Sequence, residues 1–150
     1  MDHGLKAAEL FLSGYNCAQA VAVAFHEELG LTESQAAKMA SAFGGGMGRM
    51  REVCGAVSGM LMVMGLLYGY DNSDADSKKK ELYKQVQELA EKFRQENGSI
   101  VCREILKNPP SDPNPSPRTA EYYAKRPCCR MVMTAAKLMD AFIEEHPLEK

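Results

Sequence analysis

The sequence predicts an all-α fold, because helical patterns cover most of its 150 residues. Four apolar residues follow one another at intervals of four, three and four and so share one face of a helix: Leu82, Val86, Leu89 and Phe93. No stretch of useful length alternates apolar and polar residues as a half-buried strand does. A chain of this length can bury one sizeable core, so we expect a single-domain helical bundle over 1–150.

The first helices are bounded by capping residues and glycine. A short amphipathic helix over 5–12 ends at Ser13 and Gly14. Asn16 is a good N-cap for a helix over 17–29, which Gly30 would end.

A third helix is expected from Thr32, which forms a capping-box pattern with Gln35, to about Phe43. The glycine-rich run 44–48 breaks the chain there, because glycine is unfavourable inside a helix. An apolar helix over about 51–68 follows.

Proline and capping residues mark the ends of the helices expected in the second half of the chain. A long amphipathic helix over 78–96 is followed by a short one that Ser99 can cap. Five prolines within 108–117 predict an extended surface loop. Thr119 can cap a short helix that ends before Pro127, which suits the first turn of a last helix, about 128–145. The expected bundle therefore has a proline-rich surface loop at about 108–117.

The most apolar segment is the uncharged stretch of eighteen residues from Val53 to Tyr70. Its length suits a membrane span, but glycines and Ser58 interrupt it and no second span accompanies it. We therefore expect the central buried helix of the bundle rather than insertion into a membrane. The N-terminus shows no basic start followed by an apolar stretch, so a cytoplasmic protein is expected.

The composition argues against nucleic-acid binding. Lys and Arg number 18 against 20 Asp and Glu, which gives a net charge of -2, whereas phosphate binding needs a basic surplus. There is no Trp, and aromatic residues make up only 7%. The 10 methionines are expected to fill core gaps, and the Met-rich apolar helix is compatible with a homodimer. The residues do not identify a redox partner.

Five cysteines carry the strongest chemical signal: Cys17, Cys54, Cys102, Cys128 and Cys129. There is no CxxC pair, so the usual zinc-ribbon and thioredoxin patterns are absent. Each cysteine lies near a predicted helix N-terminus, where the helix dipole lowers thiol pKa values. Four segments that each offer such a thiol could form one shared site. The alternative is inert packing in the core.

The adjacent pair Cys128 and Cys129 should contribute one inward side chain, because consecutive helical residues face different directions. Cys128 is in phase with the apolar residues Val132 and Ala135 and is favoured as the inward residue.

The glycines around Cys54 have two interpretations. Gly55 and Gly59 are spaced so that another helix can approach closely. Alternatively, this face and the loop glycines Gly45 and Gly46 leave room for a cofactor, a substrate or an anion beside the cysteine. Arg51 would then supply positive charge.

Several of these segments together resemble the C_GCAxxG_C_C family of redox-active proteins. The residues that carry the resemblance are 14–20, 43–48, 54–59, Cys102-Arg103-Glu104 and the late cysteine. The resemblance extends from about Gly4 to Phe142. It implies a small helical protein with a redox role and four characteristic cysteines, namely Cys17, Cys54, Cys102 and either Cys128 or Cys129.

Three functions remain open. In the first, Cys54 near Arg51 is the attacking thiolate of a thiol–disulfide or electron-transfer protein, and another characteristic cysteine resolves the mixed disulfide. In the second, a metal-binding shell of four cysteines, Cys17, Cys54, Cys102 and Cys128, holds zinc or an iron–sulfur cluster. In the third, the chain is a non-catalytic helical interaction module. We rank the redox function first. His3, His26 and His146 are expected to be solvated rather than metal ligands.

Overall fold

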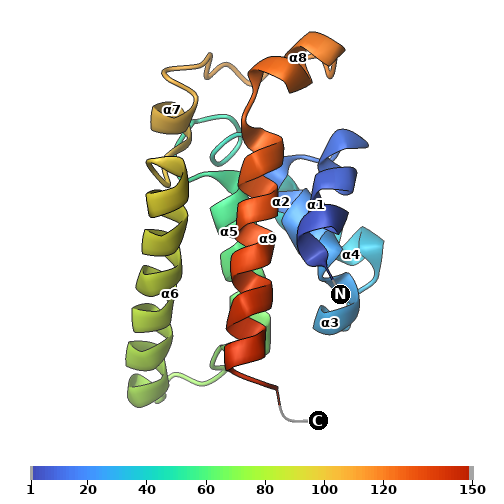
Figure 1. Ribbon diagram of the computed structural model, residues 1–150. Coiled ribbons are helices and arrows are strands. Elements are labelled where there is room, and N and C mark those ends of the chain that lie inside the picture. The colour runs from blue at the N-terminus through green and yellow to red at the C-terminus, as the bar shows by residue number, and fades with distance from the viewer. Residues whose placement is uncertain (1, 149–150) are drawn as a thin grey trace.

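The computed structural model describes residues 2–148, which contain nine α-helices, one short 3₁₀ helix and no strand (Figure 1). The prediction of an all-α fold is confirmed. The elements are α1 (His3–Leu12), α2 (Cys17–Ala24), α3 (His26–Leu29), α4 (Glu33–Ala40), η1 (Ser41–Phe43), α5 (Gly55–Tyr68), α6 (Asp76–Asn97), α7 (Cys102–Ile105), α8 (Ala120–Lys125) and α9 (Cys128–Glu145).

The centre of the bundle is formed by α2, α5 and α9, which pack against one another. Helix α1 covers α2 and α9, α4 lies on α2, and α6 packs along α9 and α5 (Figure 1). The largest fully buried side chains include Phe11, Phe25, Phe93, Met60, Met64, Met131 and Met139. The methionines of α5 and α9 therefore fill the core, as a flexible thioether can.

Asn16, Thr32 and Thr119 cap the helices that they were expected to begin, whereas Ser99 does not cap α7, whose N-cap is Val101. The side chain of Asn16 accepts from the N–H of Gln19, whose own side chain accepts from the Asn16 N–H, so α2 starts with a complete capping box. Thr32 caps α4 in the same way, and Thr119 accepts from the N–H of Tyr122 at the start of α8. The segment expected as one helix over 17–29 is divided at Phe25 into α2 and α3.

The apolar helix begins at Gly55, later than the expected position 51. The delay arises because Gly45, Gly46, Met47, Gly48, Arg49 and Arg51 all have positive φ values, between 56° and 71°. This left-handed backbone is incompatible with an α-helix and favours glycine. Among the described residues, no helix is both long enough and apolar enough to cross a membrane.

The glycine-rich loop, α7, the proline-rich loop, α8 and the start of α9 gather at one end of the bundle, at the top of Figure 1. Arg49 fixes the proline-rich loop by donating from Nε to the carbonyl oxygen of Asp112 and from Nη1 to the hydroxyl of Ser116. Arg51 donates from Nε to the carbonyl oxygen of Pro110. Two loops far apart in the sequence are thereby joined over the ends of the central helices.

Candidate functional site

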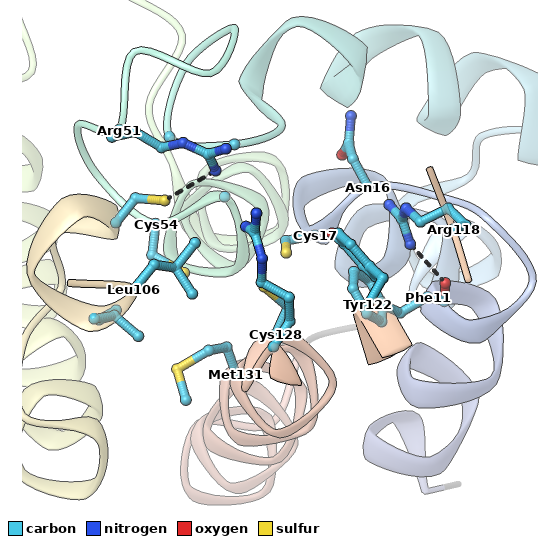
Figure 2. Close-up of a pocket in the computed structure, with 16 residues that line it drawn as sticks. Phe11, Asn16, Cys17, Arg51, Cys54, Leu106, Arg118, Tyr122, Cys128 and Met131 are labelled. Atoms are coloured by element: carbon cyan, nitrogen blue, oxygen red, sulfur yellow. Dashed lines mark hydrogen bonds between the residues drawn. The ribbon is translucent and has the colours of Figure 1, made fainter. Parts of the chain in front are cut away.

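Four cysteines meet around one cavity of about 60 Å³ at this end of the bundle (Figure 2). Cys17 is the first residue of α2, and Cys54 is the N-cap of α5. Cys102 is the first residue of α7, and Cys128 is the first residue of α9. The structure thus places these four sulfur-bearing residues at helix N-termini and around a common space.

The fifth cysteine, Cys129, does not belong to the lining of this cavity among the described residues. Its neighbour Cys128 is buried and joins the main core with Met131 and Val132, whereas Cys129 is only partly buried. The two side chains leave α9 in different directions, so Cys128 is the inward residue of the pair, as the phase of the apolar residues indicates.

A short antiparallel contact between residues 52–54 and 100–102 brings Cys54 and Cys102 together. Val53 and Val101 form an isolated β-bridge. The N–H of Cys54 donates to the carbonyl oxygen of Ile100 at 2.7 Å, and the N–H of Cys102 donates to the carbonyl oxygen of Glu52 at 2.6 Å. Helices α5 and α7 both start directly after this contact, which explains why two helix N-termini share one wall of the cavity.

The glycines proposed from the sequence have different roles. Gly45, Gly46 and Gly55 line the cavity, but Gly59 does not belong to its described lining. A Cβ atom on Gly59 would lie 2.8 Å from the carbonyl oxygen of Ala18. Gly59 is therefore a close-approach point between α5 and α2 rather than a wall of the site, and Gly55 serves both purposes, since its Cβ would lie 3.1 Å from the Ala18 nitrogen.

Arg51 contacts a different cysteine from the one expected. Its side chain is 4% exposed, and Nη1 lies 3.7 Å from the sulfur of Cys102, to which it donates a hydrogen bond (Figure 2). Arg51 therefore supplies positive charge to the cysteine cavity, but its direct partner is Cys102 and not Cys54.

Two further arginines at the cavity, Arg118 and Arg126, were not predicted from the sequence. Arg118 donates to the carbonyl oxygens of Phe11 and Tyr15 and lies over the ring of Tyr122, 4.9 Å from its centroid. Arg126 lies over the same ring at 5.1 Å. Both line the cavity. For Arg126, the signal in the sequence was its position directly before the last predicted helix. Arg118, in contrast, reaches the cavity through the path of the proline-rich loop.

One cysteine has a lowered pKa. The pKa of Cys128 falls to about 7, chiefly because its sulfur accepts a hydrogen bond from the thiol of Cys17, and the positive charges of Arg126, Arg118 and Arg51 also favour the thiolate. Burial opposes these effects but does not overcome them. The same hydrogen bond raises the pKa of Cys17 well above its ordinary value, because this thiol must keep its proton to donate it.

Burial of Cys54 acts against its expected role as the attacking thiolate. Burial raises the pKa of Cys54 to about 12, although the backbone N–H groups of Ala56 and Val57 favour its thiolate. Burial also raises the pKa of Cys102 and outweighs the hydrogen bond from Arg51. Loss of hydration thus outweighs the backbone N–H groups at Cys54 and the arginine charges at Cys102, and these cysteines are thiols near pH 7.

The described residues contain no group of three or more His, Cys, Asp or Glu side chains arranged to hold a metal ion, and all five cysteines are free. The expected metal-binding shell of four cysteines is therefore not shown in the described residues. Among the histidines, His3 is not solvated as expected. It is buried, it contacts Asp140 and Glu28 through its two ring nitrogens, and it stacks on Phe25.

Comparison with known families shows which family the chain belongs to. Residues 15–142 match the sequence model of a family described as "Putative redox-active protein (C_GCAxxG_C_C)". The chain belongs to the C_GCAxxG_C_C family. The match includes all five cysteines and every described lining residue of the cavity except Phe11. No curated protein and no solved structure matches the chain.

Proposed function

We propose that this C_GCAxxG_C_C protein reduces disulfides by thiol–disulfide exchange, with Cys128 as the attacking thiolate and Cys17 as the resolving thiol. The observation that carries the proposal is the placement of Cys17 and Cys128 around one cavity of about 60 Å³. The Cys17 thiol there also lowers the pKa of Cys128 to about 7, while the pKa of Cys17 itself is raised. The two residues come from the first turns of α9 and α2 and line the same cavity.

The pKa of Cys128 suits an attacking thiol. The thiolate is the nucleophilic form, and a thiol whose pKa lies near the ambient pH combines a large thiolate fraction with high nucleophilicity. Cys54 and Cys102 keep their protons near pH 7 because burial raises their pKa values. They are therefore not expected to compete with Cys128 for the first attack.

The exchange proceeds in two balanced steps. The Cys128 thiolate attacks one sulfur of a substrate disulfide, a Cys128–substrate bond forms, and one substrate thiolate leaves. Cys17 then gives its proton to the departing thiolate and attacks the sulfur of Cys128, which releases the second substrate thiolate. The substrate disulfide gains two electrons, the two protein thiols are oxidised to one disulfide, and an external dithiol reductant is needed to restore them.

Geometry supports the second step. Cys17 and Cys128 line the same small cavity, and a disulfide requires their two sulfurs to approach to about 2.05 Å. Both cysteines are the first residues of their helices, where a small backbone shift is less costly than in a helix interior.

Trapping of the mixed disulfide tests the proposal. In a Cys17→Ser variant treated with the neutral disulfide of mercaptoethanol, the adduct should accumulate on Cys128, because the serine cannot resolve it. The wild-type protein should release the adduct, and so should a Cys129→Ser control, in which the resolving thiol is intact. Intact-mass and peptide measurements identify the modified residue. An adduct that settles on Cys54, or equal accumulation in the wild-type protein and the Cys17→Ser variant, would overturn the assignment.

A further inference from the structure

An open cleft of about 450 Å³ adjoins the cysteine cavity, and the two share part of their walls. The shared residues include Asn16, Gly45, Arg51, Arg118, Tyr122 and Arg126. The cysteine cavity alone accommodates only a few atoms, whereas the adjoining cleft lies within the size range of small-molecule sites, roughly 300–1,000 Å³. The cleft is therefore large enough for a small molecule and lies directly beside the cysteine cavity.

The charged side chains in the described lining of the cleft are all positive. Arg49, Arg51, Arg118 and Arg126 line it, and its described lining contains no Asp or Glu. Within the described part of the chain, Arg49 is near the carboxylate of Asp112, whereas Arg51, Arg118 and Arg126 form no ion pair. These three guanidinium groups, which have no carboxylate partner among the described side chains, are a local feature that the overall net charge of -2 conceals.

The arginines are held in position before any ligand arrives. Arg118 is fixed by hydrogen bonds to the backbone of Phe11 and Tyr15 and by its contact with Tyr122. Arg126 also lies over the Tyr122 ring, and no hydrogen bond from its guanidinium is found in residues 2–148. Its donors therefore remain available. A prepositioned guanidinium suits a carboxylate, which it can bind through two parallel hydrogen bonds.

We propose that the substrate of this protein is a small disulfide that carries carboxylate groups, bound in the cleft by Arg126 and Arg118 with its sulfur–sulfur bond directed at Cys128. This inference rests on the proposed thiol–disulfide exchange and adds the substrate class. The arginines bind the carboxylate, and their positive charge also stabilises the thiolate that leaves when Cys128 attacks.

Three disulfides of similar size and different charge test the substrate class: those of mercaptopropionate, mercaptoethanol and cysteamine, which are anionic, neutral and cationic. The rate of adduct formation on Cys128 is measured for each in the Cys17→Ser protein. Each rate is divided by the rate of the same disulfide with a small reference thiol, which removes differences in intrinsic reactivity. The corrected rate should be about tenfold higher for the anionic than for the neutral disulfide, and lowest for the cationic one.

A variant at Arg126 separates the effect of this arginine on substrate binding from its effect on the pKa of Cys128. Arg126→Met removes one charge and should raise the pKa of Cys128, which slows all three disulfides alike. The change in the pKa of Cys128 cancels when the rate with the anionic disulfide is divided by the rate with the neutral one. This ratio should fall about fivefold, because one positive charge near the bound carboxylate is lost. Arg130→Met, on an exposed position of α9 outside both cavities, is the matched control and should leave the ratio unchanged.

The outcomes distinguish the two proposals. If Cys128 reacts with all three disulfides at equal corrected rates, the substrate class is wrong while thiol–disulfide exchange stands. If Cys128 reacts with none of them faster than the reference thiol does, the proposed function itself fails. An anionic preference that survives Arg126→Met unchanged would contradict the placement of the carboxylate beside Arg126.

Discussion

The guanidinium of Arg51 joins the sulfur of Cys102, 3.7 Å from its Nη1, to the proline-rich loop, because its Nε donates to the carbonyl oxygen of Pro110 at 2.9 Å. Arg51 is buried and has a positive φ of 63°. The side chain therefore connects the cysteine cavity with the loop that covers it.

Replacing Arg51 by methionine should release the proline-rich loop. The variant leaves the Pro110 carbonyl and the Cys102 sulfur without their donor, at a cost of about 1–3 kcal/mol in the free energy of unfolding. Urea unfolding measures the stability, and limited proteolysis measures the accessibility of 108–117. Arg94→Met, which removes an exposed ion pair with Glu91, should change neither quantity. Unchanged proteolysis of the loop in Arg51→Met would contradict the role of this arginine.

The reactivity of Cys128 should depend on pH with a midpoint of about 7. The rate of its alkylation by iodoacetamide rises with pH as the thiolate forms, and peptide mass spectrometry separates it from the slower Cys54. Cys17→Ala removes the hydrogen bond and should move the midpoint upward toward the ordinary value of 9.0. Cys17→Ser retains a donor and should move it less. A wild-type midpoint near 9 would show that Cys128 has no lowered pKa.

The raised pKa of Cys54 predicts a loss of stability at alkaline pH. Its pKa is about 12 in the fold against an ordinary value of 9.0, so the thiol stabilises the folded state fully below pH 9 and this contribution decreases as the pH rises toward 12. The free energy of unfolding should fall by about 1 kcal/mol more in the wild-type protein than in Cys54→Ala between neutral pH and about pH 10. Parallel pH profiles for the two proteins would exclude a buried, protonated Cys54.

Two glycines of α5 should respond in opposite ways to the same substitution. Gly59→Ala places a Cβ 2.8 Å from the carbonyl oxygen of Ala18 and 3.0 Å from Cβ of Val21, so it should destabilise the fold by about 1–3 kcal/mol. Gly65→Ala meets no atom within 4 Å and should stabilise the helix by up to about 1 kcal/mol. Urea unfolding measures both. Equal effects would mean that α5 and α2 do not approach closely at Gly59.

Local signals in the sequence predicted much of the fold and part of the site. Asn16, Thr32 and Thr119 mark helix starts because capping depends on neighbouring residues alone. Cysteines near predicted helix starts were expected to share a site, and the phase of the last helix correctly favours Cys128 over Cys129 as the inward residue.

Features that depend on contacts distant in sequence were not predictable. His3 is buried because α9 presents Asp140 and α3 presents Glu28 to its ring, and no local pattern announces those partners. Arg118 reaches the cysteines only through the course of the proline-rich loop. The helix N-terminus was expected to activate Cys54, but the balance between helix dipole and burial depends on how deeply the packed core encloses the sulfur.

The pairing of cysteines on oxidation tests the central claim most directly. The reduced protein is oxidised with one equivalent of the disulfide of mercaptoethanol, the remaining thiols are alkylated, and the linked peptides are identified by mass spectrometry with fragmentation between Cys128 and Cys129. We predict a single disulfide between Cys17 and Cys128, with Cys54 and Cys102 recovered as alkylated thiols. A disulfide between Cys54 and Cys102, with Cys17 and Cys128 still reduced, would contradict the account.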